Sequence, residues 1–302
     1  MLTGIIDIGS NTVRLAVYLI EGSRMEMLMK KKHMVGLAAH VRDGVMQQSG
    51  IDAAVRVLQE FQSFLHTFQI TAVYAFTTAA LRNASNSREA VAEIEARTGL
   101  SIQVISGERE AEYDFIGATH SLAAEDGLLI DIGGGSTEIV SYENRSIRSK
   151  VSLPMGSLSM DSRFVAGVLP TRRECIAIRD EAERVMGAME EFPERGEEIV
   201  GIGGAFKGGC ALYDALFHQP ATNVRMNADQ LLSLISRFQS DHGISQEMTI
   251  MLMKTVPDRM ETVIPGLIIA EVLADRFQCA TITYSDSGVR EGFLYAEVMK
   301  QG

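Results

Sequence analysis

Two short segments of the chain share a residue pattern suited to binding phosphate. Residues 6–18 read IDIGSNTVRLAVY and residues 130–142 read IDIGGGSTEIVSY; they align without a gap and are identical at five of thirteen positions. In each, an aspartate precedes glycine and short polar residues, a composition that lets backbone N–H groups converge on an anion. One Asp-x-Gly turn is common in many proteins, but two in register predict two phosphate-binding turns facing each other across a cleft.

The candidate phosphate ligands in these two turns are backbone groups and short polar side chains. They are Asp7, Gly9, Ser10, Asn11, Thr12, Gly133, Gly134, Gly135, Ser136 and Thr137. Each aspartate stands at the end of an apolar strand, from which its carboxylate can reach a metal ion or an attacking water. The succession of an apolar strand, a turn of small residues and a second strand predicts a hairpin in each copy.

Thr78 and Arg82 follow another expected strand, over residues 71–76. Ligand sites of α/β proteins gather at such strand ends. The planar guanidinium of arginine matches the oxygens of a phosphate group. Position alone equally fits an arginine on the surface of a helix.

An acidic cluster, Glu108, Glu110 and Glu112, opens an expected helix after Ser106 and Gly107. Favourable acidic charge near a helix N-terminus explains most clusters of this kind. The alternative is that one glutamate orients a water molecule. Glu108 and Glu112 share a helix face and Glu110 points elsewhere, so the spacing does not choose among them.

A third glycine-rich turn follows the expected strand over residues 198–202 and contains Gly203, Gly204 and Lys207. A strand, a glycine turn and a helix in succession are a common phosphate-binding arrangement. The Walker pattern GxxxxGK[ST] is absent. A last small-residue segment, Ser285 to Gly292, can complete a site or cap a helix.

Alternating strands and helices must position these residues, which predicts an α/β fold. Helices are expected over 51–68, 87–97, 108–116, 172–189, 228–239, 265–276 and 289–300, and further strands over 102–105 and 281–284. The repeated hairpins divide the chain into two α/β domains, 1–125 and 126–302. The terminal helix, about 289–302, is expected to pack back on the first domain.

Composition narrows the class of protein and its surroundings. A chain of 302 residues with 46% hydrophobic residues is globular, and its net charge of −11 opposes general binding to nucleic acid, so we expect no DNA partner. No apolar run is long enough for a membrane span, and no leader segment is recognisable. Three dispersed cysteines and six histidines without metal-site spacing predict neither a disulfide framework nor a thiolate or histidine metal site. We therefore expect a cytoplasmic protein.

The motifs taken together resemble those of the Ppx/GppA phosphatases, the exopolyphosphatases and guanosine pentaphosphate phosphohydrolases. The matching segments occur in order from about residue 4 to about residue 298: DIGSNT from Asp7, Thr78 with Leu81-Arg82, Ser106-Gly107 with Glu110-Ala111, DIGGGSTE from Asp131, Pro265-Gly266-Leu267, and SDSGVREG from Ser285. The combination of DIGGGSTE, SGxxEA and SDxGxREG is highly specific.

The resemblance implies a duplicated actin-like ATPase (ribonuclease H-like) fold whose two domains flank an interdomain cleft. It implies hydrolysis of the terminal phosphate of polyphosphate, or of the 5′-γ-phosphate of pppGpp, with Mg²⁺ (or Mn²⁺). It selects Glu110 as the catalytic base, with Arg82, Asp131 and Glu138 as further catalytic residues, and Asp131, Glu138 and Asp7 as the metal ligands. A homodimer is also implied.

Three departures from the family pattern accompany the resemblance. Thr77 stands where the family has a glycine, and the Gly201–Gly209 turn lacks the usual serine and threonine. The longer members continue into helical C-terminal domains, which places this chain with the short, two-domain members. Two alternatives remain open: a catalytically weak sensor of guanosine polyphosphates, and an ATP-using kinase or ATPase of the same superfamily.

Overall fold

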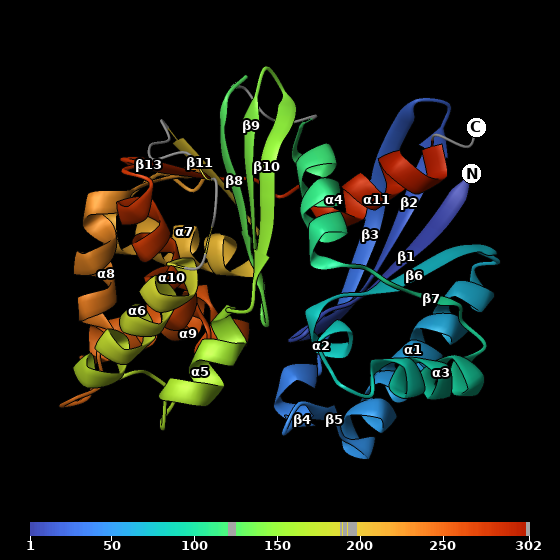
Figure 1. Ribbon diagram of the computed structural model, residues 1–302, viewed down its shortest axis with the longest axis horizontal. Helices are drawn as coiled ribbons and strands as arrows, with labels where there is room; N and C mark the ends of the chain where they lie inside the picture. The colour runs from blue at the N-terminus through green and yellow to red at the C-terminus, as the bar shows by residue number, and fades with distance from the viewer. Residues whose placement is uncertain (120–124, 188, 190–191, 193–197, 300–302) are drawn as a thin grey trace. The chain divides into compact units, whose positions relative to one another are not determined.

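Two compact α/β units make up the chain in its computed structural model, which describes residues 1–119, 125–187, 189, 192 and 198–299 (Figure 1). Unit 1 comprises residues 1–110 and the segment that begins at Leu294; unit 2 comprises residues 111–293. Within the described residues, no helix is both long and apolar enough to cross a membrane.

Unit 1 is built on a five-stranded sheet of order β3-β2-β1-β6-β7. Strands β1, β6 and β7 run parallel, and β2 and β3 extend the sheet as an antiparallel meander. Its strands are β1 (Leu2–Ile8), β2 (Thr12–Glu21), β3 (Arg24–Met34), β6 (Ala72–Thr77) and β7 (Ile102–Val104), with β4 (Val41–Arg42) and β5 (Val45–Met46) forming a small separate sheet. Its helical segments are η1 (Leu37–His40), α1 (Gln48–Thr67), α2 (Ala79–Arg82), α3 (Ser87–Thr98) and the first turn of α4 (Gly107–Thr119), with the π-helical η4 (Leu294–Val298).

The core of unit 1 lies between its sheet and helices α1 and α3. Alternate residues of β1, such as Ile6 and Ile8, pack with Leu58 and Phe61 of α1 and with Ile94 of α3. The period of two along the strand and of about 3.6 along the helix places these side chains on one face each. The same alternation turns Asp7 to the opposite face of the sheet.

Unit 2 is built on a six-stranded sheet of order β10-β9-β8-β11-β13-β12. Its strands are β8 (Gly127–Ile132), β9 (Thr137–Glu143), β10 (Ser146–Leu153), β11 (Glu198–Ile202), β12 (Arg225–Asn227) and β13 (Thr281–Tyr284). Its helices are α5 (Ser157–Phe164), α6 (Arg172–Met186), α7 (Gly203–Phe217), η2 (Ala228–Gln230), α8 (Leu231–Arg237), α9 (Gln246–Thr255), η3 (Pro257–Arg259), α10 (Val263–Arg276) and α11 (Val289–Phe293).

The order of elements in unit 1 recurs in unit 2. Each unit begins with a three-stranded antiparallel meander, β1-β2-β3 or β8-β9-β10, and then adds parallel strands beside the first strand. Helices connect the parallel strands in both units. The duplication seen in the hairpin motifs therefore extends to the whole topology, and an α/β fold is confirmed.

The sheet of unit 2 is covered on both faces. One face packs on a large cluster that includes Ile130 and Ile132 of β8 and the nearly all-apolar helix α10. The other face, with Leu129 and Val140, packs on Ala111, Phe115 and Ala118 of α4. Burial on both faces explains why β8 is a continuous apolar run broken only by Asp131.

Gly292 of the SDSGVREG segment and Gly117 of α4 allow helices α11 and α4 to approach closely. A Cβ at Gly292 would lie 1.7 Å from the carbonyl oxygen of Tyr113, and a Cβ at Gly117 would lie 2.2 Å from the carbonyl oxygen of Gly288. No larger residue fits at either contact without moving a backbone. The glycines of this segment therefore serve helix packing within unit 2.

Several elements depart from the sequence-based expectation. The division between units falls after Glu110, before the predicted boundary at residue 125, because α4 from Ala111 onward packs on the sheet of unit 2. The helix expected over 228–239 is the short 3₁₀ turn η2 followed by α8. The terminal helix is interrupted after Phe293 by η4, which groups with unit 1; its predicted end at Lys300 lies outside the described residues.

Candidate functional site

The turn of unit 1 joins β1 to β2 and presents its backbone N–H groups outward. The N–H of Gly9 donates to the carbonyl oxygen of Thr12 at 3.1 Å and closes the turn. Among the described residues, the N–H groups of Ser10 and Asn11 meet no acceptor. The carbonyl oxygen of Ser10 accepts from the N–H of Ala38 at 2.9 Å, which holds the turn in place from behind.

The turn of unit 2 repeats this geometry at the equivalent positions. The N–H of Gly133 donates to the carbonyl oxygen of Ser136 at 2.9 Å. Within the part of the chain that the structure describes, the N–H groups of Gly134 and Gly135 likewise meet no acceptor. Two consecutive N–H donors without protein partners are a binding concavity for an anion. Both predicted turns therefore have the backbone form expected of a phosphate cradle.

The first glycine of each turn makes the same close approach in both copies. A Cβ at Gly9 would lie 3.1 Å from the carbonyl oxygen of Thr12, and a Cβ at Gly133 would lie 3.1 Å from that of Ser136. These contacts are tighter than nine in ten observed Cβ contacts, so a larger residue would push the closing carbonyl away by a few tenths of an ångström. The closure of the turn therefore favours the glycine that the two copies share.

Three threonine hydroxyls at or beside the ends of these strands contact atoms of the protein. The Thr137 hydroxyl donates to the carbonyl oxygen of Met155 at 2.7 Å, and the Thr12 hydroxyl lies 3.4 Å from the sulfur of Met34. Thr78 is buried at the N-cap of α2. Thr77, the departure from the family pattern, donates to the carbonyl oxygen of Ile8 at 3.0 Å and ties β6 to the end of β1.

Arg82 and Glu110, which are predicted to act together, form an ion pair in unit 1. Nη1 of Arg82 donates to Oε2 of Glu110 at 2.5 Å and to the carbonyl oxygen of Ile105 at 3.2 Å. Only 7% of Glu110 is exposed. Ser106 starts helix α4 by accepting the N–H groups of Arg109 and Glu110, so the Ser106-Gly107 pair sets where Glu110 lies. Glu108 is exposed whereas Glu110 is buried, so these two glutamates, between which the sequence did not choose, lie in different surroundings.

Asp131 and Glu138 are directly opposite each other on β8 and β9 of unit 2. Side chains at such positions lie on the same face of the sheet, with Cβ atoms about 5 Å apart. Glu138 is 1% exposed and accepts a hydrogen bond from the Ser152 hydroxyl at 2.7 Å.

Two facing carboxylates fit Mg²⁺, which proteins bind through one or two carboxylates while phosphate oxygens and water complete the shell. Across the described residues, no group of three or more His, Cys, Asp or Glu side chains is placed to hold a metal by itself. The donors therefore suit a cation that is shared with a phosphate substrate.

The third glycine turn lies beside Asp131. Gly203 has φ of +84° and begins helix α7, and a Cβ there would lie 2.1 Å from Oδ1 of Asp131. Gly204 is covered by the guanidinium of Arg259, with Nη1 2.1 Å from where a Cβ would stand. The structure thus brings Gly203 and Gly204 to the C-terminal end of β8, beside Asp131. The sequence did not indicate Arg259 as a site residue, because it lies in the short 3₁₀ turn η3 and no motif surrounds it.

Lys207 belongs to a different cluster of unit 2. Its Nζ lies 3.1 Å from Oδ1 of Asp286 and 5.8 Å from the centre of the Tyr284 ring. Burial and the neighbouring Asp286 carboxylate raise the pKa of Tyr284. Lys207 is exposed at this position. Lys207 therefore forms an ion pair with Asp286 of the SDSGVREG segment.

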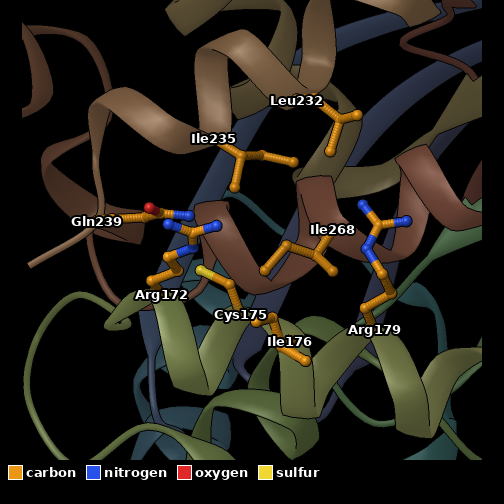
Figure 2. Close-up of a pocket in the computed structure, with 8 residues that line it drawn as sticks. All are labelled: Arg172, Cys175, Ile176, Arg179, Leu232, Ile235, Gln239 and Ile268. Carbon is orange, nitrogen blue, oxygen red and sulfur yellow. The ribbon is translucent and has the colours of Figure 1, made fainter.

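A separate hollow of about 170 Å³ lies among helices α6, α8 and α10 of unit 2 (Figure 2). Its floor is apolar, Arg172 and Gln239 meet at one end, and Arg179 stands at the other (Figure 2). Arg179 is paired with Glu271. The lining residues are Arg172, Cys175, Ile176, Arg179, Leu232, Ile235, Gln239 and Ile268, so none of the predicted site residues contributes to this hollow.

Curated relatives of this chain include proteins named for phosphate chemistry. A Haemophilus influenzae protein, provisionally named as an exopolyphosphatase, is 28% identical over 96% of this chain and 90% of its own length. Exopolyphosphatase 1 of Mycobacterium tuberculosis is 29% identical over 60% of this chain and 54% of its own. A guanosine-5′-triphosphate,3′-diphosphate pyrophosphatase of Pseudoalteromonas atlantica is 29% identical over 62% of this chain and 37% of its own.

Solved structures and a family model agree with these relatives. The Aquifex aeolicus PPX-GPPA enzyme superposes with a TM-score of 0.76 at 27% identity, covering 98% of this chain and 99% of that one. An exopolyphosphatase from Cytophaga hutchinsonii, 23% identical, shares the fold with a TM-score of 0.85 over 100% of this chain and 98% of its own. The predicted actin-like ATPase fold is thereby confirmed. The chain has paired glycine turns and a buried Glu110, and the Ppx/GppA phosphatase family model matches its residues 16–301. The chain therefore belongs to the Ppx/GppA phosphatase family.

Proposed function

We propose that this protein is a phosphohydrolase that removes the terminal phosphate of inorganic polyphosphate and the 5′-γ-phosphate of pppGpp. The observation that carries the proposal is the pair of equivalent turns, each with two consecutive N–H groups that meet no acceptor among the described residues. Each turn suits one phosphoryl group, and both substrates carry such groups in series. The names of the exopolyphosphatase and pyrophosphatase relatives support the same two substrates.

Glu110 is the base in this proposal. Its buried carboxylate is held by Arg82, so its orientation is set before substrate arrives. We propose that it accepts a proton from the water that attacks the terminal phosphorus in line. The P–O bond to the next phosphate breaks, and that phosphate leaves with the electron pair. Phosphoryl transfer depends mainly on positioning and electrostatics, which a fixed carboxylate and fixed N–H donors provide.

Further charged groups of the chain suit a phosphate substrate. We propose that the guanidinium of Arg82, which holds Glu110, also stabilises charge on the equatorial oxygens. Asp131 and Glu138 would hold Mg²⁺ or Mn²⁺. When bound, the cation would neutralise phosphate charge in the ground state and in the transition state.

The test is release of inorganic phosphate from polyphosphate, pppGpp and ATP by wild-type protein and Glu110→Gln, with Mg²⁺ and with excess EDTA. We expect release from polyphosphate or pppGpp, and loss of that release in the variant and in EDTA. Release from ATP alone would contradict the proposal in favour of a kinase or ATPase. Tight binding of pppGpp with no release from any substrate would instead indicate a sensor.

A further inference from the structure

The hollow among helices α6, α8 and α10 of unit 2 is formed by side chains that the phosphate chemistry does not use. Leu232 and Ile235 of α8 point toward α6, and Ile268 of α10 lies between the two helices (Figure 2). The remaining wall is one face of α6, because its lining residues are three, one and three positions apart: Arg172, Cys175, Ile176 and Arg179. The hollow is therefore a product of helix packing within unit 2.

The hollow is apolar from its floor to its mouth. Ile235 and Ile268 are buried. Cys175 is buried with them, and burial raises the pKa of its thiol to about 11, so the floor carries no charge at neutral pH. At the mouth, 51% of Ile176 and 55% of Leu232 are exposed. A ligand that covers these two side chains would remove apolar surface from water, which favours binding.

The two ends of the hollow carry arginines in different surroundings. Arg179 is paired with Glu271, a buried carboxylate of α10. At the other end, the guanidinium of Arg172 lies beside the amide of Gln239 (Figure 2), and among the described residues it forms no ion pair or hydrogen bond with the protein. A planar guanidinium with an amide donor next to it suits a carboxylate. Only the Arg172 end therefore offers an uncompensated positive charge to a ligand.

We propose that this hollow binds a small carboxylate with an apolar body. Its head group would lie against Arg172 and Gln239, and its body would fill the apolar part. The volume sets the size of the body: the hollow measures about 170 Å³, and an apolar cavity of about 150 Å³ holds benzene, so one six-membered ring fits.

A neighbouring carboxylate limits the charge of the head group. Oδ2 of Asp241 accepts the backbone N–H of Arg172 at 2.7 Å. A dianionic head group such as phosphate would be repelled more strongly by Asp241 than a monoanion is. The site thus favours a carboxylate over a phosphate, in contrast to the two glycine turns.

The test is methyl nuclear magnetic resonance of the full chain, labelled at its isoleucine δ1 methyl groups. Phenylacetate is the probe, and phenylacetamide has the same body without the charge. We expect the signals of Ile176, Ile235 and Ile268 to shift along one binding curve with phenylacetate. Phenylacetamide should bind about tenfold more weakly, because it lacks the charge that Arg172 binds. Benzylphosphonate, which is dianionic at pH 8, should also bind more weakly than phenylacetate.

Arg172→Gln separates the head group of the probe from its body. Arg172 is exposed in the first turn of α6, so its replacement leaves the helix packing intact. We expect the affinity for phenylacetate to fall about tenfold and that for phenylacetamide to stay within about twofold. Arg173→Gln is the matched control, since it removes the same charge from the next, exposed residue, which does not line the hollow. Circular dichroism establishes that both variants are folded.

Four results would overturn the inference. They are an absence of shifts at the three isoleucines, equal affinities for phenylacetate and phenylacetamide, tighter binding of benzylphosphonate than of phenylacetate, and equal losses of affinity in Arg172→Gln and Arg173→Gln. The readout involves neither the glycine turns nor turnover. A protein that binds phenylacetate as expected but releases no phosphate would refute the proposed function alone.

Discussion

The two turns have the same backbone form but different supports. In unit 1, the carbonyl oxygen of Asn11 accepts N–H groups from the loop that follows β3, and that of Ser10 accepts the N–H of Ala38 in η1. In unit 2, the carbonyl oxygen of Gly134 instead accepts the N–H groups of Leu158 and Ser159 in the first turn of α5. The duplicated chain kept the outward N–H groups and changed what lies behind them.

This difference shows which backbone N–H groups remain available to bind an anion. The first N–H groups of a helix usually have no partner within the helix and often bind anions. In α5 those of Ser157, Leu158 and Ser159 are already bound to carbonyl oxygens of the glycine turn. The donors left for a phosphate are therefore those of the turn. Three predictions test this division between the turn, its support and the proposed catalytic side chain.

The largest effect is expected at Glu110, the proposed catalytic carboxylate, which belongs to unit 1. Glu110→Gln should lower kcat for phosphate release by about 10²–10⁴-fold with little change in KM, because a general base acts in the transition state. Glu108→Gln is the matched control, since Glu108 is exposed one residue beyond Gly107. Steady-state kinetics on polyphosphate measure both. A kcat for Glu110→Gln within tenfold of wild type would show that Glu110 is not the general base.

A smaller effect is expected where unit 2 supports its turn. A Cβ at Gly156 would lie 2.5 Å from the carbonyl carbon of Gly134, so Gly156→Ala must push the turn away from α5. We expect a loss of about 1–3 kcal/mol in the free energy of unfolding, together with lower activity. Chemical denaturation followed by circular dichroism measures it.

The control for that variant is Gly167→Ala. A Cβ at Gly167 would meet one atom, the carbonyl oxygen of Leu169, at an ordinary 3.8 Å. If Gly156→Ala unfolds at the same denaturant concentration as this control, the close contact between turn and helix is not a constraint on unit 2.

The smallest effect concerns Asp161 on α5, the helix that supports the turn of unit 2. Burial, with the nearby Glu261 and Glu174 carboxylates, raises the pKa of Asp161 to about 7. The folded chain thus binds this proton more tightly than the unfolded chain, and stability falls as pH rises from about 4 to about 7. On α1 of unit 1, by contrast, hydrogen bonds from Arg97 and Lys31 lower the pKa values of Asp52 and Glu60.

Asp161→Asn keeps this side chain neutral at every pH. Its stabilisation relative to wild type should therefore be greater at pH 8 than at pH 5, by up to about 2.7 kcal/mol, because two pH units separate pH 5 from the pKa of about 7 and each is worth about 1.4 kcal/mol. Asp180→Asn, at an exposed position of α6, is the control. Unfolding curves at both pH values measure the difference, and an equal gain at pH 5 and pH 8 would argue against a buried, protonated Asp161.

Local patterns predicted the elements whose form is determined locally. Both hairpins and the strands Glu198–Ile202 and Thr281–Tyr284 follow from apolar runs and glycine turns. The glycine-rich segment 201–209, which was expected to be a turn, instead ends a strand and begins helix α7. The closeness of Arg82 and Glu110 came from motif resemblance, since spacing alone left three glutamates open.

Contacts between distant segments were not predictable in the same way. Arg259 lies against Gly204, and Ser152 donates a hydrogen bond to Glu138, because helix packing and sheet register bring them there. Nothing within a few residues of these side chains signals such a partner. The position of the division between the units likewise depends on where Ala111 and Phe115 pack, which the sequence of α4 does not reveal.

The central claim is that equivalent N–H groups in both turns bind phosphate, and amide nuclear magnetic resonance tests it most directly. Polyphosphate would be titrated into ¹⁵N-labelled, deuterated Glu110→Gln protein with Mg²⁺, so that the substrate persists. We predict that the amide signals of Ser10, Asn11, Gly134 and Gly135 shift together along one binding curve. Shifts confined to one turn, or to residues outside both, would contradict the claim.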